Sequence, residues 1–363
     1  MSVHNDTMDY RNVLVTGGAG FVGSSLALRL KSAFPDAEVC ALDNLSRKGS
    51  ELNVPRLEAA GIAFIRGDVR RAEDFKQFAG TDLIVDCAAE PSVMAGKDGS
   101  PLYALETNLW GTVNALELAR TSKAKLLFLS SSRVYPVAEL NAIETEETPE
   151  RFAIAPGQTL LGVSPQGVSE AFSFGEQRTL YGATKLASEM LIKEYEFLYG
   201  TQAIINRCGV IAGPWQFGKA DQGVAVLWMA KHVFNQQLSY IGFGGQGKQV
   251  RDFLHIDDLC DAIELQSKSF EVFSGHTFNI GGGVEHSASL KELTTLCQKI
   301  TGNVVDVGSI PETRWGDAKI YISDNSRFSA ISGWVPKRSV DETMRDIHAW
   351  ITKNKKDLLD VLR

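Results

Sequence analysis

Long apolar runs, paired cysteines and metal-binding histidine patterns are all missing from this sequence. No stretch of its 363 residues has the apolar length of a signal peptide or a membrane-spanning helix. The five cysteines are odd in number, widely spaced and never arranged as CxxC, which argues against a disulfide framework or a zinc site. The six histidines form neither HxxxH nor HExxH. We therefore expect a cytoplasmic protein with reduced thiols and no metal ion.

An excess of positive charge is also missing. The chain has 37 Lys and Arg residues against 44 Asp and Glu residues, which gives a net charge of −7. Because such a field repels phosphate polymers and anionic lipids, nucleic acid and membrane surfaces are disfavoured as partners. An anionic ligand would have to meet a local arginine or a helix N-terminus. With 44% hydrophobic residues, a chain of this length can bury a large core in one or two domains.

Up to about residue 210, β-branched runs alternate with helix-like stretches. Strands are predicted at 12–16, 38–42, 63–66, 83–87, 125–130 and 202–206. Helices are predicted at 22–33, 103–121 and 179–199. This order is typical of the doubly wound α/β (Rossmann) fold, in which helices cover both faces of a parallel sheet.

The rest of the chain reads differently. Residues 136–178 are too long for an ordinary connection and predict a lid, a binding loop or a disordered insert. After Arg207 the chain is rich in glycine, with helices predicted at 222–235, 257–267 and 289–300. We expect a first domain at 1–206 and a second, smaller α/β domain at 207–363 that binds substrate, with about 250–283 as a segment that can return to the first.

A glycine-rich turn joins the first predicted strand to the first predicted helix. In Thr16-Gly-Gly-Ala-Gly-Phe-Val-Gly23, glycines at 17, 20 and 23 allow a tight turn and close approach of a pyrophosphate to the helix N-terminus. The second strand runs into Asp43, where a carboxylate can accept hydrogen bonds from a ribose and would repel a 2′-phosphate. The pattern favours NAD over NADP, although Arg47 and Lys48 leave NADP open.

Two further strand ends suit the same ligand. The third strand ends in Gly67-Asp68-Val69, which suits an adenine edge, and the fourth is followed by the small residues Ala88 and Ala89. Because the carboxyl ends of parallel strands meet at one edge of the sheet, we expect all four strand ends to line one dinucleotide site.

A catalytic pattern follows. Tyr181 and Lys185 are four residues apart on a predicted helix, so they share a face, and a nearby ammonium is expected to lower the pKa of the phenol toward that of a general base. The fifth strand ends in Ser130-Ser131-Ser132-Arg133, which places hydroxyls at the ligand-binding edge.

Together the glycine turn, Asp43, the SSSRVY segment and YGATK resemble the extended short-chain dehydrogenase/reductase family, the NAD-dependent nucleotide-sugar epimerases and dehydratases. The resemblance implies that Tyr181 takes a sugar hydroxyl proton, that Lys185 also holds the nicotinamide ribose, and that Ser131 hydrogen-bonds the reacting oxygen. The implied cofactor contacts are Gly17, Gly20, Phe21, Val22, Asp43, Asn44, Ser46, Asp68, Val69, Ala88, Ala89, Asn108, Tyr181 and Lys185.

The same resemblance implies a nucleotide-sugar site in the second domain. Arg251, in a segment similar to the family's RDxxH, would contact the substrate pyrophosphate, and the segment of Arg314 and Asp317 resembles the second pyrophosphate and ribose contact. The implied substrate contacts are Ser131, Ser132, Arg133, Arg207, Gln216, Gln222, Gln249, Arg251, Arg314 and Asp317. It also implies a homodimer built on the helices of Tyr103 and Tyr181, or a tetramer of two such dimers.

Which reaction and sugar the chain serves is left open between three hypotheses. Segments 43–49, 216–223 and 247–252 resemble the subgroup that inverts C2 of CDP-linked dideoxyhexoses such as CDP-paratose, which favours a CDP-hexose. The alternatives are a UDP- or GDP-sugar 4-epimerase and a non-catalytic NAD-binding sensor. A 4,6-dehydratase is disfavoured, because Ser132 and Arg133 stand where that reaction needs an acid and a carboxylate.

Overall fold

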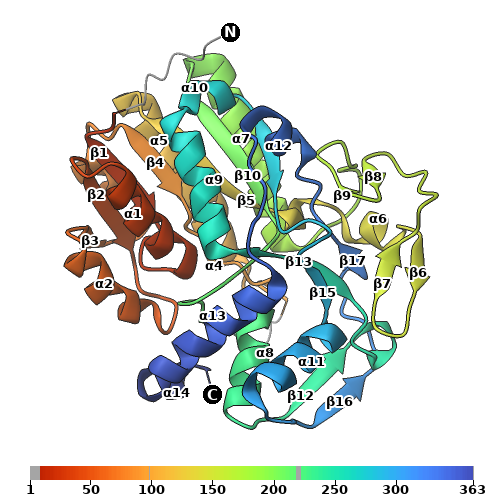
Figure 1. Cartoon of the computed structure of the whole chain (residues 1–363). Helices are drawn as coiled ribbons and strands as arrows, with labels where there is room; N and C mark the ends of the chain where they lie inside the picture. Colours follow the sequence, from red (N-terminus) through yellow and green to blue (C-terminus); the bar gives the residue numbers. More distant parts are fainter. Residues whose placement is uncertain (1–8, 98, 218–221, 363) are drawn as a thin grey trace.

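Seven parallel strands form the central sheet of the computed structural model, which describes residues 9–97, 99–217 and 222–362 (Figure 1). They are β1 (Asn12–Thr16), β2 (Glu38–Asp43), β3 (Ala63–Arg66), β4 (Leu83–Asp86), β5 (Lys125–Ser131), β10 (Ala203–Cys208) and β14 (Thr277–Ile280). Their spatial order is β14-β10-β5-β4-β1-β2-β3, so the winding reverses between β1 and β4. The predicted doubly wound α/β fold is confirmed.

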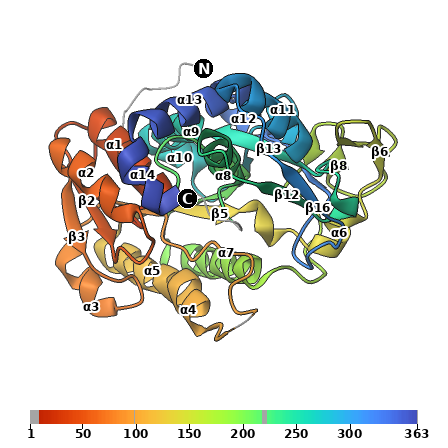
Figure 2. The same ribbon diagram turned by 90° about the horizontal axis from the view of Figure 1, so that it is seen from below.

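Helices cover both faces of this sheet (Figure 2). One face is covered by α1 (Phe21–Ala33), α2 (Val54–Ala59), α9 (Ile256–Lys268), α10 (Phe270–Phe273) and α12 (Ser326–Ser332). The other is covered by α3 (Ala72–Phe75), α4 (Leu102–Leu105), α5 (Gly111–Ser122) and α7 (Leu180–Tyr199). Because both faces are buried, β4, β5 and β10 are buried at every position, as is usual for parallel sheets.

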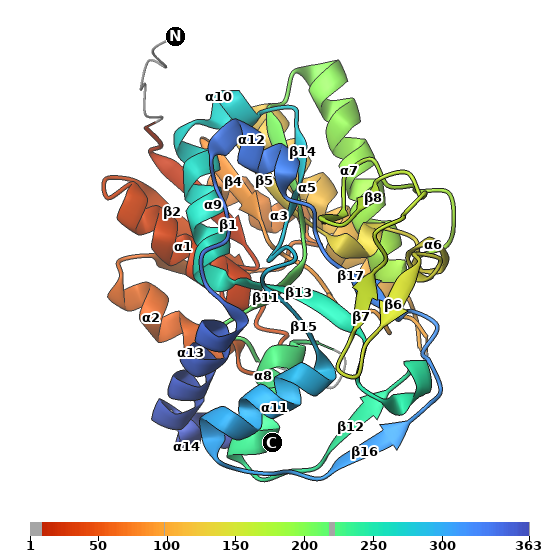
Figure 3. The same cartoon turned by 45° about the vertical axis from the view of Figure 1, so that its right-hand side comes forward.

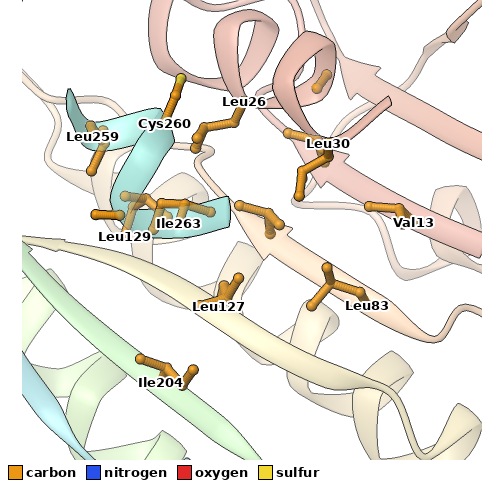
Figure 4. Packing of buried hydrophobic residues seen from close by; sticks show 14 of the residues in the cluster. Val13, Leu26, Leu30, Leu83, Leu127, Leu129, Ile204, Leu259, Cys260 and Ile263 are labelled. Carbon is orange, nitrogen blue, oxygen red and sulfur yellow. The ribbon is translucent and has the colours of Figure 1, made fainter. Parts of the chain in front are cut away.

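The core beneath α1 and α9 shows how these layers are held together. Leu26 and Leu30 of α1 and Ile263 of α9 meet the side chains that point up from the strands, among them Leu127 and Leu129 (Figure 4). Helix α9 lies far along the chain but packs beside α1, and β14 then pairs with β10. In this segment α9 and α10 therefore pack on the large sheet and β14 is one of its strands. The predicted domain boundaries stay a prediction.

A second unit lies below the sheet (Figure 3). Its strands are β11 (Val210–Ala212), β13 (Val250–His255), β15 (Ser287–Ser289) and β17 (Ile320–Tyr321), with β12 (Leu238–Ile241) paired to β16 (Val307–Ile310). Its helices are α8 (Val224–Val233), α11 (Leu290–Thr301), α13 (Val340–Lys353) and α14 (Lys355–Leu362). They share one apolar core, which includes Trp228, Met344 and Trp350.

Residues 136–178, called the insert below, are folded. They contain α6 (Val137–Asn141) and two short hairpins, β6 (Thr145–Glu147) with β7 (Phe152–Ile154) and β8 (Val163–Ser164) with β9 (Gly167–Val168). Their apolar side chains share a core with those of β17 and its neighbours, and the rings of Phe172 and Tyr321 both pack against Tyr135. The hypothesis of a disordered insert is therefore wrong.

The remaining short elements are η1 (Ser50–Asn53), η2 (Lys76–Phe78), η4 (Ser132–Val134), η5 (Phe243–Gly245) and the π-helical turn η3 (Glu106–Trp110) between α4 and α5. No helix within the described ranges has both the length and the apolar character needed to cross a membrane. Over the same ranges, no three metal-ligating side chains gather in one place.

Candidate active site

A long cleft runs along the carboxyl ends of the strands, where the sheet reverses direction, and the second unit forms its opposite wall. The predicted site residues that line it are Gly17, Gly20, Phe21, Val22, Asp43, Asn44, Ser46, Val69, Ala88, Ala89, Ser131, Ser132, Arg133, Tyr181, Lys185, Gln216 and Gln222. Those outside its lining are Asp68, Asn108, Arg207, Gln249, Arg251, Arg314 and Asp317.

The glycine turn forms one end of the cleft. Gly17 has a φ of +61°, and a Cβ there would lie 2.9 Å from Ala88 Cα, so the turn needs glycine at this position. Helix α1 starts after Gly20 without a side-chain cap and without an acidic residue in its first turn. Its first N–H groups are thus available to a phosphate. The turn, the helix start and the carboxylate of Asp43 on the cleft wall fit a bound dinucleotide.

Asp43 is held in place by the backbone around it. Its carboxylate accepts hydrogen bonds from the N–H groups of Ala19 at 3.1 Å and Leu45 at 2.8 Å. Burial raises the pKa of Asp43, and these hydrogen bonds oppose the rise. Arg47 contacts Gln222 and the carbonyl of Phe217, and Lys48 contacts the carbonyl of Asp360. Both cations therefore have protein partners away from Asp43, which favours NAD over NADP.

Two predicted cofactor residues lie behind the cleft wall. The carboxylate of Asp68 pairs with Arg70, at 2.6 Å from Nη2, and this hydrogen bonding lowers the pKa of Asp68 to about 2. Only its neighbours Gly67 and Val69 line the cleft. Asn108 sits in the π-helical turn, where it accepts from Glu90 N–H at 2.7 Å and donates to Thr184 Oγ1 at 3.1 Å. It therefore ties the loop after β4 to helix α7.

Ser131 and Tyr181 meet in the cleft. The hydroxyl of Ser131, at the end of β5, hydrogen-bonds Tyr181 in the first turn of α7 and accepts from the backbone N–H of Arg133 at 3.2 Å. Burial raises the pKa of Tyr181 to about 12, whereas the hydrogen bond with Ser131 and the charge of Arg133 act in the opposite direction. The pair therefore offers a reacting oxygen two hydroxyl groups.

Lys185 does not lower the pKa of Tyr181 as the sequence predicted. Its ammonium donates to the carbonyl of Leu129 at 2.9 Å and lies 4.5 Å from the ring centre of Phe128. Burial lowers the pKa of Lys185 itself. That prediction is wrong for this structure, because spacing on a helix sets the face of a side chain but not the partner that its end finds.

Arg207 also differs from the sequence prediction of a substrate contact. It lies on β10 with its guanidinium turned to Glu189 of α7, with Nε 3.1 Å from both carboxylate oxygens and Nη2 2.7 Å from Oε2. Its Nη1 donates to the hydroxyl of Tyr135 at 3.3 Å. The charge of the carboxylate and these hydrogen bonds raise the pKa of Arg207. The residue therefore holds β10 to α7.

The second unit brings polar side chains toward the cleft. Gln216 lines it, with Nε2 donating to Ile211 O at 3.0 Å and Oε1 buried without a partner among the described residues. Gln249 donates to Ile241 O at 3.0 Å, away from the cleft lining. Arg251 donates to the carbonyls of Val250 and Ala318, both at 2.7 Å.

Arg251 lies among charges of both signs. Burial lowers its pKa to about 10, and the charge of Arg133 acts in the same direction, while Asp317 opposes it. Arg314 accepts at its carbonyl a 3.1 Å hydrogen bond from the N–H of Asp317, which closes the turn before β17. Of the two predicted residues, Asp317 thus lies near Arg251 and Arg133 in space.

Sequence reasoning missed an apolar part of the cleft. Cys87, Cys208, Val210 and Ile211 line it near the catalytic pair. Burial raises the pKa of Cys208 to about 12, so this thiol is neutral near pH 7. The sequence could have indicated Cys208, because this residue ends β10 beside Ser131 of β5 and the cleft is formed at strand ends.

The sheet, the glycine turn and Asp43 define a dinucleotide-binding α/β protein. The profile of the NAD dependent epimerase/dehydratase family matches residues 13–281, and the chain belongs to this family. The predicted cofactor, NAD, is confirmed, and so is membership in an enzyme family of epimerases and dehydratases.

Relatives match over almost the whole chain. A CDP-paratose 2-epimerase of Salmonella typhi is 29% identical over 346 residues, which are 93% of this chain and 98% of that protein. A dTDP-glucose 4,6-dehydratase of Mycobacterium tuberculosis is 28% identical over 353 residues, 94% of each chain. The structure of Thermus thermophilus UDP-glucose 4-epimerase with NAD superposes with a TM-score of 0.75 at 26% identity, covering 94% of this chain and 99% of that one.

Proposed function

We propose that this protein is a nucleotide-sugar epimerase that inverts C2 of a CDP-linked hexose. The observation that carries epimerisation over dehydration is the composition of the catalytic strand end. Ser131 faces Tyr181 in the cleft, and the next two residues are Ser132 and Arg133. Elimination of water needs an acid for the leaving hydroxyl and a base for the adjacent proton, and neither residue supplies a carboxyl group.

The roles of the catalytic residues follow from their placement. Tyr181 takes the proton of the sugar hydroxyl and later returns it, and Ser131 hydrogen-bonds the same oxygen. A bound NAD would supply reversible hydride transfer at the sugar carbon. The start of α1 and Asp43 would hold its pyrophosphate and ribose, and Lys185 would face its nicotinamide side. Between oxidation and reduction the keto sugar would rotate in the site and present its opposite face, so that reduction inverts the carbon.

The substrate class rests on similarity and on the cleft. The Salmonella relative acts, by its name, on CDP-paratose and is similar along nearly the full length. Cys87, Cys208 and Val210 give the sugar end of the cleft an apolar wall that suits a sugar with few hydroxyl groups. The Oε1 of Gln216, which has no partner among the residues that the structure describes, offers an acceptor to a donor group of the ligand.

The test is a panel of CDP-, UDP-, GDP- and dTDP-hexoses, including CDP-paratose, incubated with the NAD-loaded protein and followed by proton NMR of the ring couplings. Inversion at C2 of a CDP-sugar is the expected result. Inversion at C4 of a UDP- or GDP-sugar would keep epimerisation and overturn the proposed substrate. Loss of water with a new keto sugar as the final product would overturn epimerisation itself.

We also propose that two copies of the chain pair through α5 and α7. These neighbouring helices expose large apolar side chains: Trp110 in the π-helical turn is 54% exposed, Met190 65% and Phe197 84%. Met190 and Phe197 are two helical turns apart on one face of α7, and a stripe of this kind marks an interface.

Light scattering should give twice the chain mass of 39.6 kDa. A Met190→Glu, Phe197→Glu double variant should give a monomer, whereas Val304→Glu, exposed elsewhere, should not.

A further inference from the structure

Arg133 enters the cleft with few partners. Its Nη1 donates to Gly316 O at 3.0 Å. In the described parts of the chain its guanidinium has no other hydrogen-bond acceptor and no carboxylate within 4 Å; Asp317 attracts it only through space. A guanidinium has five N–H donors, and this half-buried one uses only one of them within the described protein. This arrangement needs a reason other than folding.

Arg207 shows how the same chain treats a buried guanidinium whose role is structural. Three of its contacts go to the carboxylate of Glu189, and a fourth goes to a tyrosine hydroxyl. Its charge is balanced within the protein. The charge of Arg133 is balanced only in part, and its side chain faces the ligand cleft instead of the core.

The backbone of Arg133 is fixed at the catalytic pair. Its N–H donates to Ser131 Oγ, and its carbonyl oxygen lies 1.9 Å from where a Cβ of Gly182 would stand, directly beside Tyr181. From there the side chain crosses to the loop of Gly316 in the second unit. Arg251 lies near enough to feel its charge. Two guanidiniums therefore lie close to each other here, with Asp317 near both of them.

We propose that Arg133 is a specificity-determining residue that binds an anionic oxygen group at the sugar end of the substrate. A guanidinium fork suits a carboxylate or a phosphate oxygen. Two sources share this chemistry: a carboxylate on the sugar ring, or the phosphate that carries the sugar. The inference rests on the proposed function, since it assumes a nucleotide sugar in the cleft.

Binding measurements test this without turnover. Dissociation constants are measured by calorimetry on the NAD-loaded protein and on Arg133→Met for UDP-glucuronate, UDP-glucose, CDP-glucose and CMP. If the sugar carboxylate is bound, the wild type prefers UDP-glucuronate to UDP-glucose by about tenfold or more, and Arg133→Met loses this preference. If the phosphate is bound, Arg133→Met weakens both UDP-sugars and CDP-glucose by about tenfold and leaves CMP unchanged.

The inference is overturned if Arg133→Met binds all four probes within twofold of the wild type. If no probe binds the wild type, the proposed function fails together with it; if epimerisation is observed while Arg133→Met binds normally, only this inference fails. Arg133→Lys keeps the charge without the fork and should lose less affinity than the Met variant, which keeps the test valid should Arg133→Met not fold. Arg71→Met, at an exposed position, removes the same charge and should change nothing.

Discussion

The two walls of the cleft are built to recognise ligands in different ways. The sheet side uses the backbone. Residue 17 must be glycine because the backbone of Ala88 leaves no room for a side chain, and the start of α1 presents N–H groups. The second-unit side uses long side chains, such as Gln216 and Gln222, and the end of Gln222 depends on contacts with Arg47 and Glu90 from distant segments. Backbone recognition fixes a ligand through chain geometry, whereas side-chain recognition can be changed by single substitutions. The sheet side should therefore serve one cofactor, and the other side should set the substrate.

The largest effect is expected at the catalytic pair, where the two walls meet. Tyr181→Phe removes the proton acceptor and should lower kcat by roughly 10²- to 10⁴-fold, with NAD content unchanged. The assay is the NMR conversion of the best substrate. Tyr199→Phe, at the other end of α7, is the matched control and should remain fully active. A Tyr181→Phe enzyme with more than a tenth of wild-type kcat would rule out this role.

The buried ion pair of Glu189 and Arg207 allows a structural arginine to be compared with Arg133, the arginine that faces the cleft. Glu189→Gln leaves the guanidinium of Arg207 buried without its counter-charge and should lower the free energy of unfolding by about 3–5 kcal/mol. Urea unfolding measures this. Arg133→Met should cost far less, because no carboxylate of the described chain is paired with it at 4 Å. Equal losses in the two variants would contradict the distinction drawn between them.

The sheet side is tested through Asp43. Asp43→Ala removes the ribose acceptor and the charge that repels a 2′-phosphate, so NAD affinity should fall about tenfold while the preference over NADP shrinks. Titration of the cofactor-free protein with each dinucleotide measures both constants. Glu51→Ala, a nearby carboxylate that caps Gly49 N–H, is the control and should leave the preference intact. An unchanged NAD/NADP ratio in Asp43→Ala would show that selectivity lies elsewhere.

The smallest effect is spectroscopic and concerns pH. Burial raises the pKa of Tyr181 to about 12, so the phenol of the cofactor-free protein should stay protonated as the pH rises from 9 to 11. The sign follows because burial disfavours the charged form. The 295 nm absorbance of the wild type minus that of Tyr181→Phe should then be flat over this range. A midpoint below pH 10 would mean that Arg133 or Lys185 outweighs burial.

Sequence predicted the features that depend on local chain geometry. The glycine turn, the strand at 63–66 and the end of β5 all lie where expected, because strand ends and tight turns restrict composition. Helix 103–121 was predicted as continuous but contains a π-helical turn, which brings Asn108 to Glu90. Helix α13 was missed even though Ser339 and Glu342 form a capping box, a readable signal.

Side-chain partners were beyond sequence. Arg207 and Arg133 both lie near the carboxyl end of a central strand. The neighbouring sequence does not indicate that Arg207 pairs with Glu189 while Arg133 faces the cleft. The ammonium of Lys185 was assigned to Tyr181 by spacing alone, yet a carbonyl of β5 competes for it. Such choices depend on distances between elements that only the packed chain sets.

The position of β14 has a consequence for synthesis of the protein. This strand completes the large sheet beside β10, but the chain first passes through β11 to β13 of the second unit before reaching it. A ribosome must therefore release residue 280 before the seventh strand can pair. Until then the edge of β10 is unpaired and can pair with a strand of another chain. A chaperone that covers this edge during synthesis would prevent such pairing.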